Sequence, residues 1–250
     1  MITRVKEQRL LVISDLHLGN PFFKAKREIN EFLDYAVKTN ASICINGDGL
    51  DILQTSFRRI SRDTPEVFSR FKKIADRGQR VYYVIGNHDL PLENFLENWG
   101  FVRVVPFLNV ESADVRIHVE HGHLYDPLYL ANPVIYAIAT VFAGYLLKIA
   151  PPVYKLWVWY ESSRKKARSR RSGTHGIKGE HNNYLEAAEE VMSRGFDTVI
   201  FGHTHGAGVV ELGDGKQYVN TGTWLAKPNF VEIKDGVTEL KPWTNGAMVN

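Results

Sequence analysis

The chain has 250 residues, of which 44% are hydrophobic and 24% are charged, a balance that is ordinary for a globular protein with a sizeable core. Its single cysteine argues against a disulfide framework, and its short apolar start runs directly into polar residues, so we expect a cytoplasmic protein without a signal peptide. The net charge is +3, but a basic cluster at 164–171 leaves the remainder slightly acidic, and we expect no nucleic-acid partner.

The first part of the chain alternates between strand and helix patterns. Short β-branched runs predict buried strands, and apolar residues at helical spacing, such as Ile29, Phe32, Leu33 and Ala36, predict amphipathic helices. The expected strands are 9–14, 41–46, 80–86, 115–121 and 197–202, and the expected helices are 24–39 and 64–77. This alternation predicts an α/β layered fold. After Thr198, short runs with tight turns predict an antiparallel meander.

Residues 124–179 interrupt this pattern. No charged residue occurs between Pro127 and Leu147, and an aromatic stretch and the basic sequence "RKKARSRR" follow. We therefore expect a core formed by residues 1–123 and 180–250, with a mostly helical insertion at 124–179.

Polar residues with metal-binding chemistry follow each predicted strand. Because ligands bind at the carboxyl ends of strands in open α/β sheets, these side chains are expected to converge. They are Asp15, His17, Asp48, Asp51, Asn87, His88, Asp89, His121, His123, His203 and His205.

The chemistry of these groups favours a metal centre. Carboxylate, imidazole and amide donors without a thiolate suit Mn²⁺, Fe²⁺ or Zn²⁺. Asp15 and His17 are two residues apart, as are His203 and His205, so each pair is expected to point to one face of an extended segment. With Asp48, Asn87 and His121 they provide too many ligands for one tetrahedral ion but a suitable number for two metals, which could clamp both oxygens of a phosphoryl displacement.

The set resembles the calcineurin-like metallophosphoesterase family. The matching stretches are "SDLH" (14–17), "GDGLD" (47–51), "GNHD" (86–89), "HGH" (121–123) and "GHTH" (202–205). The resemblance implies a four-layer α/β/β/α sandwich around two divalent metals, with Mn²⁺ the first candidate, and here with an inserted helical lid.

Residue roles also follow from the resemblance. One metal is expected at Asp15, His17 and His205, the other at Asn87, His121 and His203, with Asp48 bridging them. His88 corresponds to the catalytic histidine of the family, which acts as general acid on the leaving oxygen or stabilises the transition state, and Asp89 is expected to orient it. The resemblance implies that water activated by the metals would attack phosphorus.

Other residues near the motifs have less specific expectations. Asp51 is expected to be a capping or structural carboxylate, and "NTGTW" (220–224) to shape the turn beside the site. His123, Arg164, Lys165 and Arg168 are candidate substrate contacts, although the histidine could be a plain loop residue and the basic cluster a solvated helix face.

The insertion bears on the substrate. A single membrane span through 127–147 is excluded, because ligands before and after it must meet in one site. The segment either packs as a buried helical hairpin or forms a lid that faces acyl chains or a membrane. Its all-round apolar character, the aromatic residues at 154–160 and the basic cluster favour a lid at the inner membrane surface, near anionic lipids.

An insertion at this place is similar to that of the bacterial UDP-2,3-diacylglucosamine hydrolases of lipid A synthesis, peripheral membrane pyrophosphatases. Their best-known members carry arginine where this chain has His88. The resemblance implies a hydrolase that converts UDP-2,3-diacylglucosamine to UMP and a lipid monophosphate. The alternatives are a soluble nucleotide or general phosphodiesterase with a structural insertion, and a membrane-associated scaffold without turnover. The sequence indicates no oligomeric state.

Overall fold

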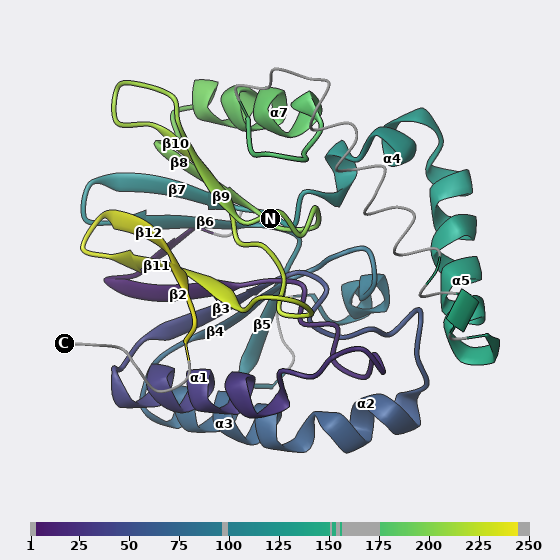
Figure 1. Cartoon of the computed structure of the whole chain (residues 1–250). Helices are drawn as coiled ribbons and strands as arrows, with labels where there is room; N and C mark the ends of the chain where they lie inside the picture. The colour runs from purple at the N-terminus through teal and green to yellow at the C-terminus, as the bar shows by residue number, and fades with distance from the viewer. Residues whose placement is uncertain (1–3, 97–99, 151, 154–155, 157–175, 245–250) are drawn as a thin grey trace.

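The computed structural model describes residues 4–96, 100–150, 152–153, 156 and 176–244. Two six-stranded mixed sheets lie face to face (Figure 1). In order across the sheet, the first consists of β12 (Val237–Pro242), β11 (Asn229–Lys234), β2 (Arg9–Ile13), β3 (Ser42–Asn46), β4 (Val81–Val84) and β5 (Val102–Val105). The second consists of β1 (Arg4–Lys6), β6 (Leu108–Ser112), β7 (Val115–Val119), β8 (Thr198–Phe201), β10 (Gln217–Asn220) and β9 (Gly208–Glu211).

Helices cover the outer side of each sheet. Helices α1 (Lys26–Lys38) and α3 (Pro65–Asp76) pack on the first sheet, and α7 (Asn182–Ser193) packs on the second (Figure 1). The helix α2 (Phe57–Asp63) precedes α3, and the 3-10 helix η1 (Leu90–Phe95) follows β4. The predicted four-layer α/β/β/α arrangement is confirmed.

The strand β2 shows how the sequence builds these layers. Its side chains alternate, so Leu10 and Val12 join the apolar cluster between the two sheets while Leu11 and Ile13 face α1 and α3. The helix α1 buries the residues that its spacing predicts, Ile29 among them. Burial on both sheet faces explains why the strand reads as one continuous apolar run.

The predicted strands of the α/β part correspond to β2, β3, β4, β7 and β8, but the short strands β1, β5 and β6 were not predicted. The expected C-terminal meander is wrong. The strands β9 and β10 form one antiparallel hairpin in the second sheet, whereas β11 and β12 form another in the first sheet. The turn between Asn220 and Asn229 carries the chain from one sheet to the other.

Within 124–179 the structure describes a short 3-10 helix at the start, η2 (His123–Tyr125), then α4 (Pro127–Ala131) and α5 (Pro133–Ile149). The long apolar run is split at Asn132, because the residue before a proline is driven out of the helical region. The Asn132 side chain then accepts hydrogen bonds from the backbone of Val134 and Ile135 and caps α5. Among the described helices, none combines the length and apolarity that a membrane crossing requires.

Candidate metal centre

The candidate site lies where the carboxyl ends of strands from both sheets come together. The strands β2, β3 and β4 are parallel neighbours in one sheet, and β7 and β8 are parallel neighbours in the other. The loops are tied to each other: the backbone nitrogens of Asp15 and His17 donate to the carbonyls of Gly47 and Asp48 at 3.1 and 2.8 Å. The backbone nitrogen of His88 donates to Oδ1 of Asp48 at 2.8 Å. The predicted convergence of strand ends is thus present in the structure.

The backbone at this site is left-handed at five non-glycine residues. The φ angles lie between 49 and 63° at Asp15, His17, Asp48, His203 and His205. The expectation that the residues of each pair share one face of an extended segment is therefore wrong. The left-handed residues turn each loop within three positions, so that Asp15 and His17 converge on one group of ligand atoms, whereas His203 and His205 supply different groups. This conformation costs roughly 1–2 kcal/mol per residue and persists only where surrounding contacts hold it.

A first group of ligand atoms comes from Asp15, His17 and His205. Their atoms lie within 4.8 Å of one another, and Nε2 of His205 lies 3.0 Å from Oδ1 of Asp15. The other carboxylate oxygen of Asp15 accepts from the backbone nitrogen of His203 at 3.1 Å and from the Ser14 hydroxyl. The carboxylate is thereby fixed with Oδ1 facing the histidines.

A second group comes from Asp48, His121 and His203. The Nδ1 atom of His121 donates to the carbonyl oxygen of Asn46 at 2.8 Å, which sets the tautomer. Its Nε2 atom then lies 3.3 Å from both Oδ2 of Asp48 and Oδ1 of Asn87. Asp48 also lies 3.9 Å from His17, so the two groups are contiguous through this carboxylate.

The donor set fits divalent metals. Both ring nitrogens of His17 are buried and have no hydrogen-bond partner in the described part of the chain; their nearest carboxylate oxygens are 3.9–4.0 Å away. A buried imidazole without a partner is costly unless a cation binds it. Carboxylates and imidazoles without thiolates suit Mn²⁺, Fe²⁺ or Zn²⁺ and do not discriminate among them.

The charges of the site are strongly coupled. Burial opposes ionisation of His121, but the attraction of Asp48 and Asp15 outweighs it and raises the pKa of His121 to about 10. Burial also opposes the charge on Asp15, yet His205 lowers its pKa to about 2. For His17, burial and the neighbouring His88 act in the same direction and lower the pKa to about 4. A neutral imidazole is the form that binds metal.

The carboxylate beside His88 is Asp51, which corrects the expectation for Asp89. The Nδ1 atom of His88 lies 2.9 Å from Oδ1 of Asp51. The carboxylate of Asp89 instead accepts from the backbone nitrogens of Gly86 and Gly49 and from the Tyr83 hydroxyl. Those bonds hold the turn after β4 in shape, so Asp89 positions the loop rather than the imidazole.

Residues that the sequence did not indicate also surround the site. Oδ2 of Asp126 lies 3.4 Å from Nε2 of His203, while its other oxygen caps α4. The rings of Tyr136 and Tyr184 lie 6.5 and 6.4 Å from that of His203. In the sequence, Asp126 before Pro127 is a helix-start signature. It indicates that Asp126 caps a helix, but it does not indicate the contact with His203.

His123 lies on the side of the centre that α4 borders, with its ring 6.0 Å from that of Tyr129. Its ring is 5.6 Å from that of His121 and 6.4 Å from that of His203. Burial, followed by these two histidines, lowers the pKa of His123 to about 3, so it is neutral in the metal-free protein. This placement is compatible with the expected substrate contact. The other expected contacts, Arg164, Lys165 and Arg168, and the aromatic residues at 154–155 and 157–160, lie outside the described residues.

Comparison with known families decides the broader assignment. The family model of the calcineurin-like phosphoesterases matches residues 8–207 of the sequence, a range that contains every ligand candidate named above. The chain belongs to the calcineurin-like phosphoesterase family. Membership makes the protein a hydrolase of phosphoester bonds, and the clustered carboxylates and imidazoles are consistent with a dinuclear metal centre.

The solved structures to which this calcineurin-like phosphoesterase is similar are distant from it in sequence. Zinc-bound vacuolar protein sorting 29 of Entamoeba histolytica is 15% identical, with a TM-score of 0.47 over 96% of this chain and 94% of that one. A predicted phosphoesterase of Streptococcus pneumoniae is 16% identical, with a TM-score of 0.41 over 94% and 98%. No curated protein sequence matches the chain.

Proposed function

We propose that this phosphoesterase hydrolyses a lipid-linked phosphate or pyrophosphate at the cytoplasmic surface of the inner membrane. The best candidate substrate is UDP-2,3-diacylglucosamine, with UMP and a lipid monophosphate as products. The observation that carries the proposal is α5, which contacts the loops of the metal centre on one side and exposes large apolar side chains on the other. The helix stands at the edge of the fold, apart from the helices that cover the two sheets (Figure 1).

The inward side of α5 is fastened to the catalytic loops. The Gln54 side chain donates to the carbonyl of Thr140 at 3.3 Å, and a Cβ atom at Gly144 would lie only 2.8 Å from Cα of Gln54. Gln54 follows Asp51 by three positions, and Asp51 contacts His88. The helix is therefore part of the wall of the site, and Tyr136 extends it toward His203.

The outward side of α5 carries large apolar residues at helical spacing. Each of them is more than half exposed: Val134, Ile135, Ile138, Val141, Phe142, Tyr145 and Ile149. The buried positions are small, Ala143 and Gly144 among them. The sequence suggested a helix that is apolar on all sides. The structure instead turns the bulky apolar residues of α5 outward, whereas a surface helix of a globular protein turns them toward the core.

A lipid bilayer is the partner that this outward stripe fits best. A helix of this kind binds in the plane of the membrane interface by burying its apolar face among acyl chains. The sequence "RKKARSRR" in the same insertion adds attraction to anionic head groups. An enzyme held in this way has its metal centre beside the phosphates of membrane lipids, which supports a substrate with acyl chains and a phosphate at the interface.

The residues of the site suit phosphoester hydrolysis. Two bound metals would neutralise charge on the phosphoryl oxygens and lower the pKa of water. Because Nδ1 of His88 is engaged by Asp51, its Nε2 atom, which lies 3.8 Å from Oδ2 of Asp48, is the one that can donate a proton to the leaving oxygen. Burial opposes the charge, but Asp48 and Asp51 raise the pKa of His88 to about 9 in the metal-free protein, so the imidazole can carry that proton near neutral pH.

The test compares two substrates on Mn²⁺-loaded protein: UDP-2,3-diacylglucosamine in mixed micelles and a small chromogenic phosphodiester. Strong preference for the acylated nucleotide is expected, and His88→Ala and Asp48→Asn should abolish hydrolysis without unfolding the protein. His118→Gln is the matched control, because it also removes a buried imidazole, one that bonds Asn109 away from the centre. Retained turnover in both site variants would refute the mechanism.

The test also separates the alternatives. Hydrolysis of the small diester alone would assign a soluble nucleotide or general phosphodiesterase, a reading that the presence of His88 in a general "GNHD" motif favours. Full metal occupancy with no hydrolysis of either compound would instead support a scaffold. The His88–Asp51 pair argues against a scaffold, because a protein without turnover does not need it.

A further inference from the structure

A buried carboxylate lies behind the loop that carries His203 and His205. Glu180 is only 7% exposed and is the first residue after the predicted insertion. It accepts hydrogen bonds from the Tyr218 hydroxyl at 2.9 Å, from Nδ2 of Asn220 at 2.8 Å and from the hydroxyl of Thr204. Thr204 stands between the two histidines, so Glu180 reaches the metal-ligand loop through one side chain.

Asn220 gives the same loop a second attachment. Its Nδ2 atom donates to the carbonyl of Gly202 at 2.8 Å and lies 3.1 Å from the hydroxyl of Thr204. Its Oδ1 atom accepts from the backbone nitrogen of Gly222 at 2.9 Å, which fixes the orientation of the amide. The loop is thereby held at Gly202 and at Thr204, the positions on either side of His203.

The loop requires such support. His203 and His205 both have φ angles of 63°, a left-handed conformation that is costly for a residue with a side chain. Two such residues separated by one position persist only if other contacts impose the turn. The side chain between them is that of Thr204. Its hydroxyl bonds Glu180 and Asn220 and also accepts from the backbone nitrogen of Gly206 at 3.4 Å.

We propose that Glu180 is a positioning residue for the metal ligands His203 and His205, acting through Thr204 and Asn220. It is not itself one of the candidate metal ligands. Glu180 directly follows the predicted insertion. The first residue after that segment therefore stabilises the "GHTH" loop at 202–205. The proposal rests on the metal site of the proposed function and not on its substrate.

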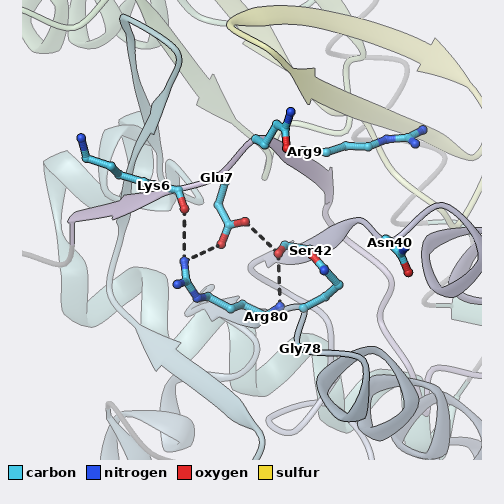
Figure 2. Close-up of a pocket in the computed structure, with 9 residues that line it drawn as sticks. Lys6, Glu7, Arg9, Asn40, Ser42, Gly78 and Arg80 are labelled. Atoms are coloured by element: carbon cyan, nitrogen blue, oxygen red, sulfur yellow. Dashed lines mark hydrogen bonds and ion pairs between the residues drawn. The ribbon is translucent and has the colours of Figure 1, made fainter.

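The chain contains a matched control, a second buried carboxylate remote from the metal centre. Glu7 is 8% exposed and accepts from the Ser42 hydroxyl at 2.8 Å and the Arg80 guanidinium at 3.2 Å (Figure 2). It also accepts from the Tyr82 hydroxyl at 2.6 Å. It lines a pocket near the amino-terminal ends of β3 and β4, whereas the ligands follow the carboxyl ends. Glu7→Gln therefore perturbs a similar network without a connection to the ligands.

The experiment measures Mn²⁺ affinity by titration calorimetry, without substrate, and thermal unfolding in EDTA. Glu180→Gln and Thr204→Val should each lower the Mn²⁺ affinity at least about tenfold. Thr204→Ser keeps the hydroxyl and should stay within about threefold of the unmodified protein, and Glu7→Gln should lower only the unfolding temperature. If Glu180→Gln does not fold, the comparison of Thr204→Val with Thr204→Ser still tests the proposal.

Two results would overturn the proposal: unchanged affinity in Glu180→Gln and Thr204→Val, or an equal loss in Glu7→Gln, which would indicate general destabilisation. An unmodified protein that binds no Mn²⁺, Fe²⁺ or Zn²⁺ would overturn both this proposal and the metal site. Metal binding without hydrolysis of the acylated nucleotide would remove only the proposed substrate.

Discussion

The Nδ1 atom of His88 lies 2.9 Å from Oδ1 of Asp51, so the carboxylate that engages the candidate catalytic imidazole comes from the loop after β3 and not from the adjacent Asp89. Asp51 also accepts from Nδ2 of Asn20 at 2.7 Å, which fixes its second oxygen. The imidazole is therefore oriented by a carboxylate that is itself held in place.

Asp51→Asn should lower kcat by about 10- to 100-fold, because it removes the group that orients His88 and favours its protonated form. Since Asp51 raises the pKa of His88, its loss should also move the alkaline limb of the kcat–pH profile to lower pH. The measurement is that profile with Mn²⁺ and a small phosphodiester.

Asp89→Asn provides the comparison for Asp51→Asn. Asp89 accepts three hydrogen bonds that shape the turn after β4, so its amide variant should lose about 2 kcal/mol of unfolding free energy and shift the alkaline limb less. A large shift of that limb in Asp89→Asn, with none in Asp51→Asn, would restore the assignment made from the sequence.

The stability of the metal-free protein should be greatest near pH 6.5. The pKa values of His88 and His121 are raised to about 9 and about 10, so their contribution is complete below pH 6.5 and is lost as the pH rises toward 9–10. The pKa of His17 is lowered to about 4, so its contribution is present above pH 6.5 and is lost as the pH falls toward 4.

Urea unfolding in EDTA between pH 4 and 10 checks this dependence. His88→Gln should flatten the alkaline decline by at most about 3 kcal/mol, the free energy that corresponds to its shift in pKa. Mn²⁺ should flatten the decline in the unmodified protein, because metal displaces the protons from the ligands. An alkaline limb that is identical in the variant would contradict the coupling of His88 to Asp48.

The sequence predicted those parts of the fold whose causes are local. Strands such as β2 and β3 are continuous apolar runs, and α1 has clear helical spacing, so each could be recognised within a short window. The ligand candidates could be found because carboxylates and imidazoles follow these strands. Both kinds of inference need only the neighbouring residues and the rule that strand ends converge.

The parts that depend on the path of the backbone could not be predicted. Left-handed φ angles at Asp15 and His17 are imposed by bonds to the loop after β3, and nothing in "SDLH" indicates them. The contact of His88 with Asp51 has the same origin, since Asp89 is nearer in sequence but its carboxylate is consumed by the turn. The outward direction of the apolar side of α5 is set by the fit of Gly144 against Gln54.

Two glycines of the "GHTH" loop should respond differently to alanine. A Cβ atom at Gly202 would lie 2.7 Å from the Ser14 hydroxyl oxygen and 2.9 Å from Oδ2 of Asp15, distances that force the Asp15 carboxylate to move. At Gly206 the nearest atom would be the Thr204 hydroxyl oxygen at 3.6 Å, an ordinary contact. Gly202→Ala should therefore lower Mn²⁺ affinity at least about tenfold, and Gly206→Ala should leave it within about twofold.

Calorimetric titration of both alanine variants with Mn²⁺ measures this difference. Because the two positions flank the same histidines, a general loosening of the loop would affect both variants alike. Equal affinities in the two variants would show that the position of Asp15 relative to Gly202 does not matter for metal binding.

The outward side of α5 gives the last prediction. Ile138→Asp and Phe142→Asp place a charge on residues that are 64% and 57% exposed, so neither should disturb the fold. If this side enters a bilayer, each variant should bind vesicles at least about tenfold more weakly, since burying one large apolar side chain is worth about 1.5–3 kcal/mol. Co-sedimentation with vesicles of phosphatidylethanolamine and phosphatidylglycerol measures the binding.

Val237→Asp is the control for these variants, because Val237 is 59% exposed in β12, outside the insertion, and should bind vesicles like the unmodified protein. All three variants should hydrolyse the small phosphodiester normally, since the metal ligands are unchanged. Hydrolysis of the acylated nucleotide should fall with vesicle binding only in the α5 variants. If Ile138→Asp and Phe142→Asp bind vesicles as strongly as Val237→Asp, the apolar side of α5 has another partner, and the membrane part of the proposal is wrong.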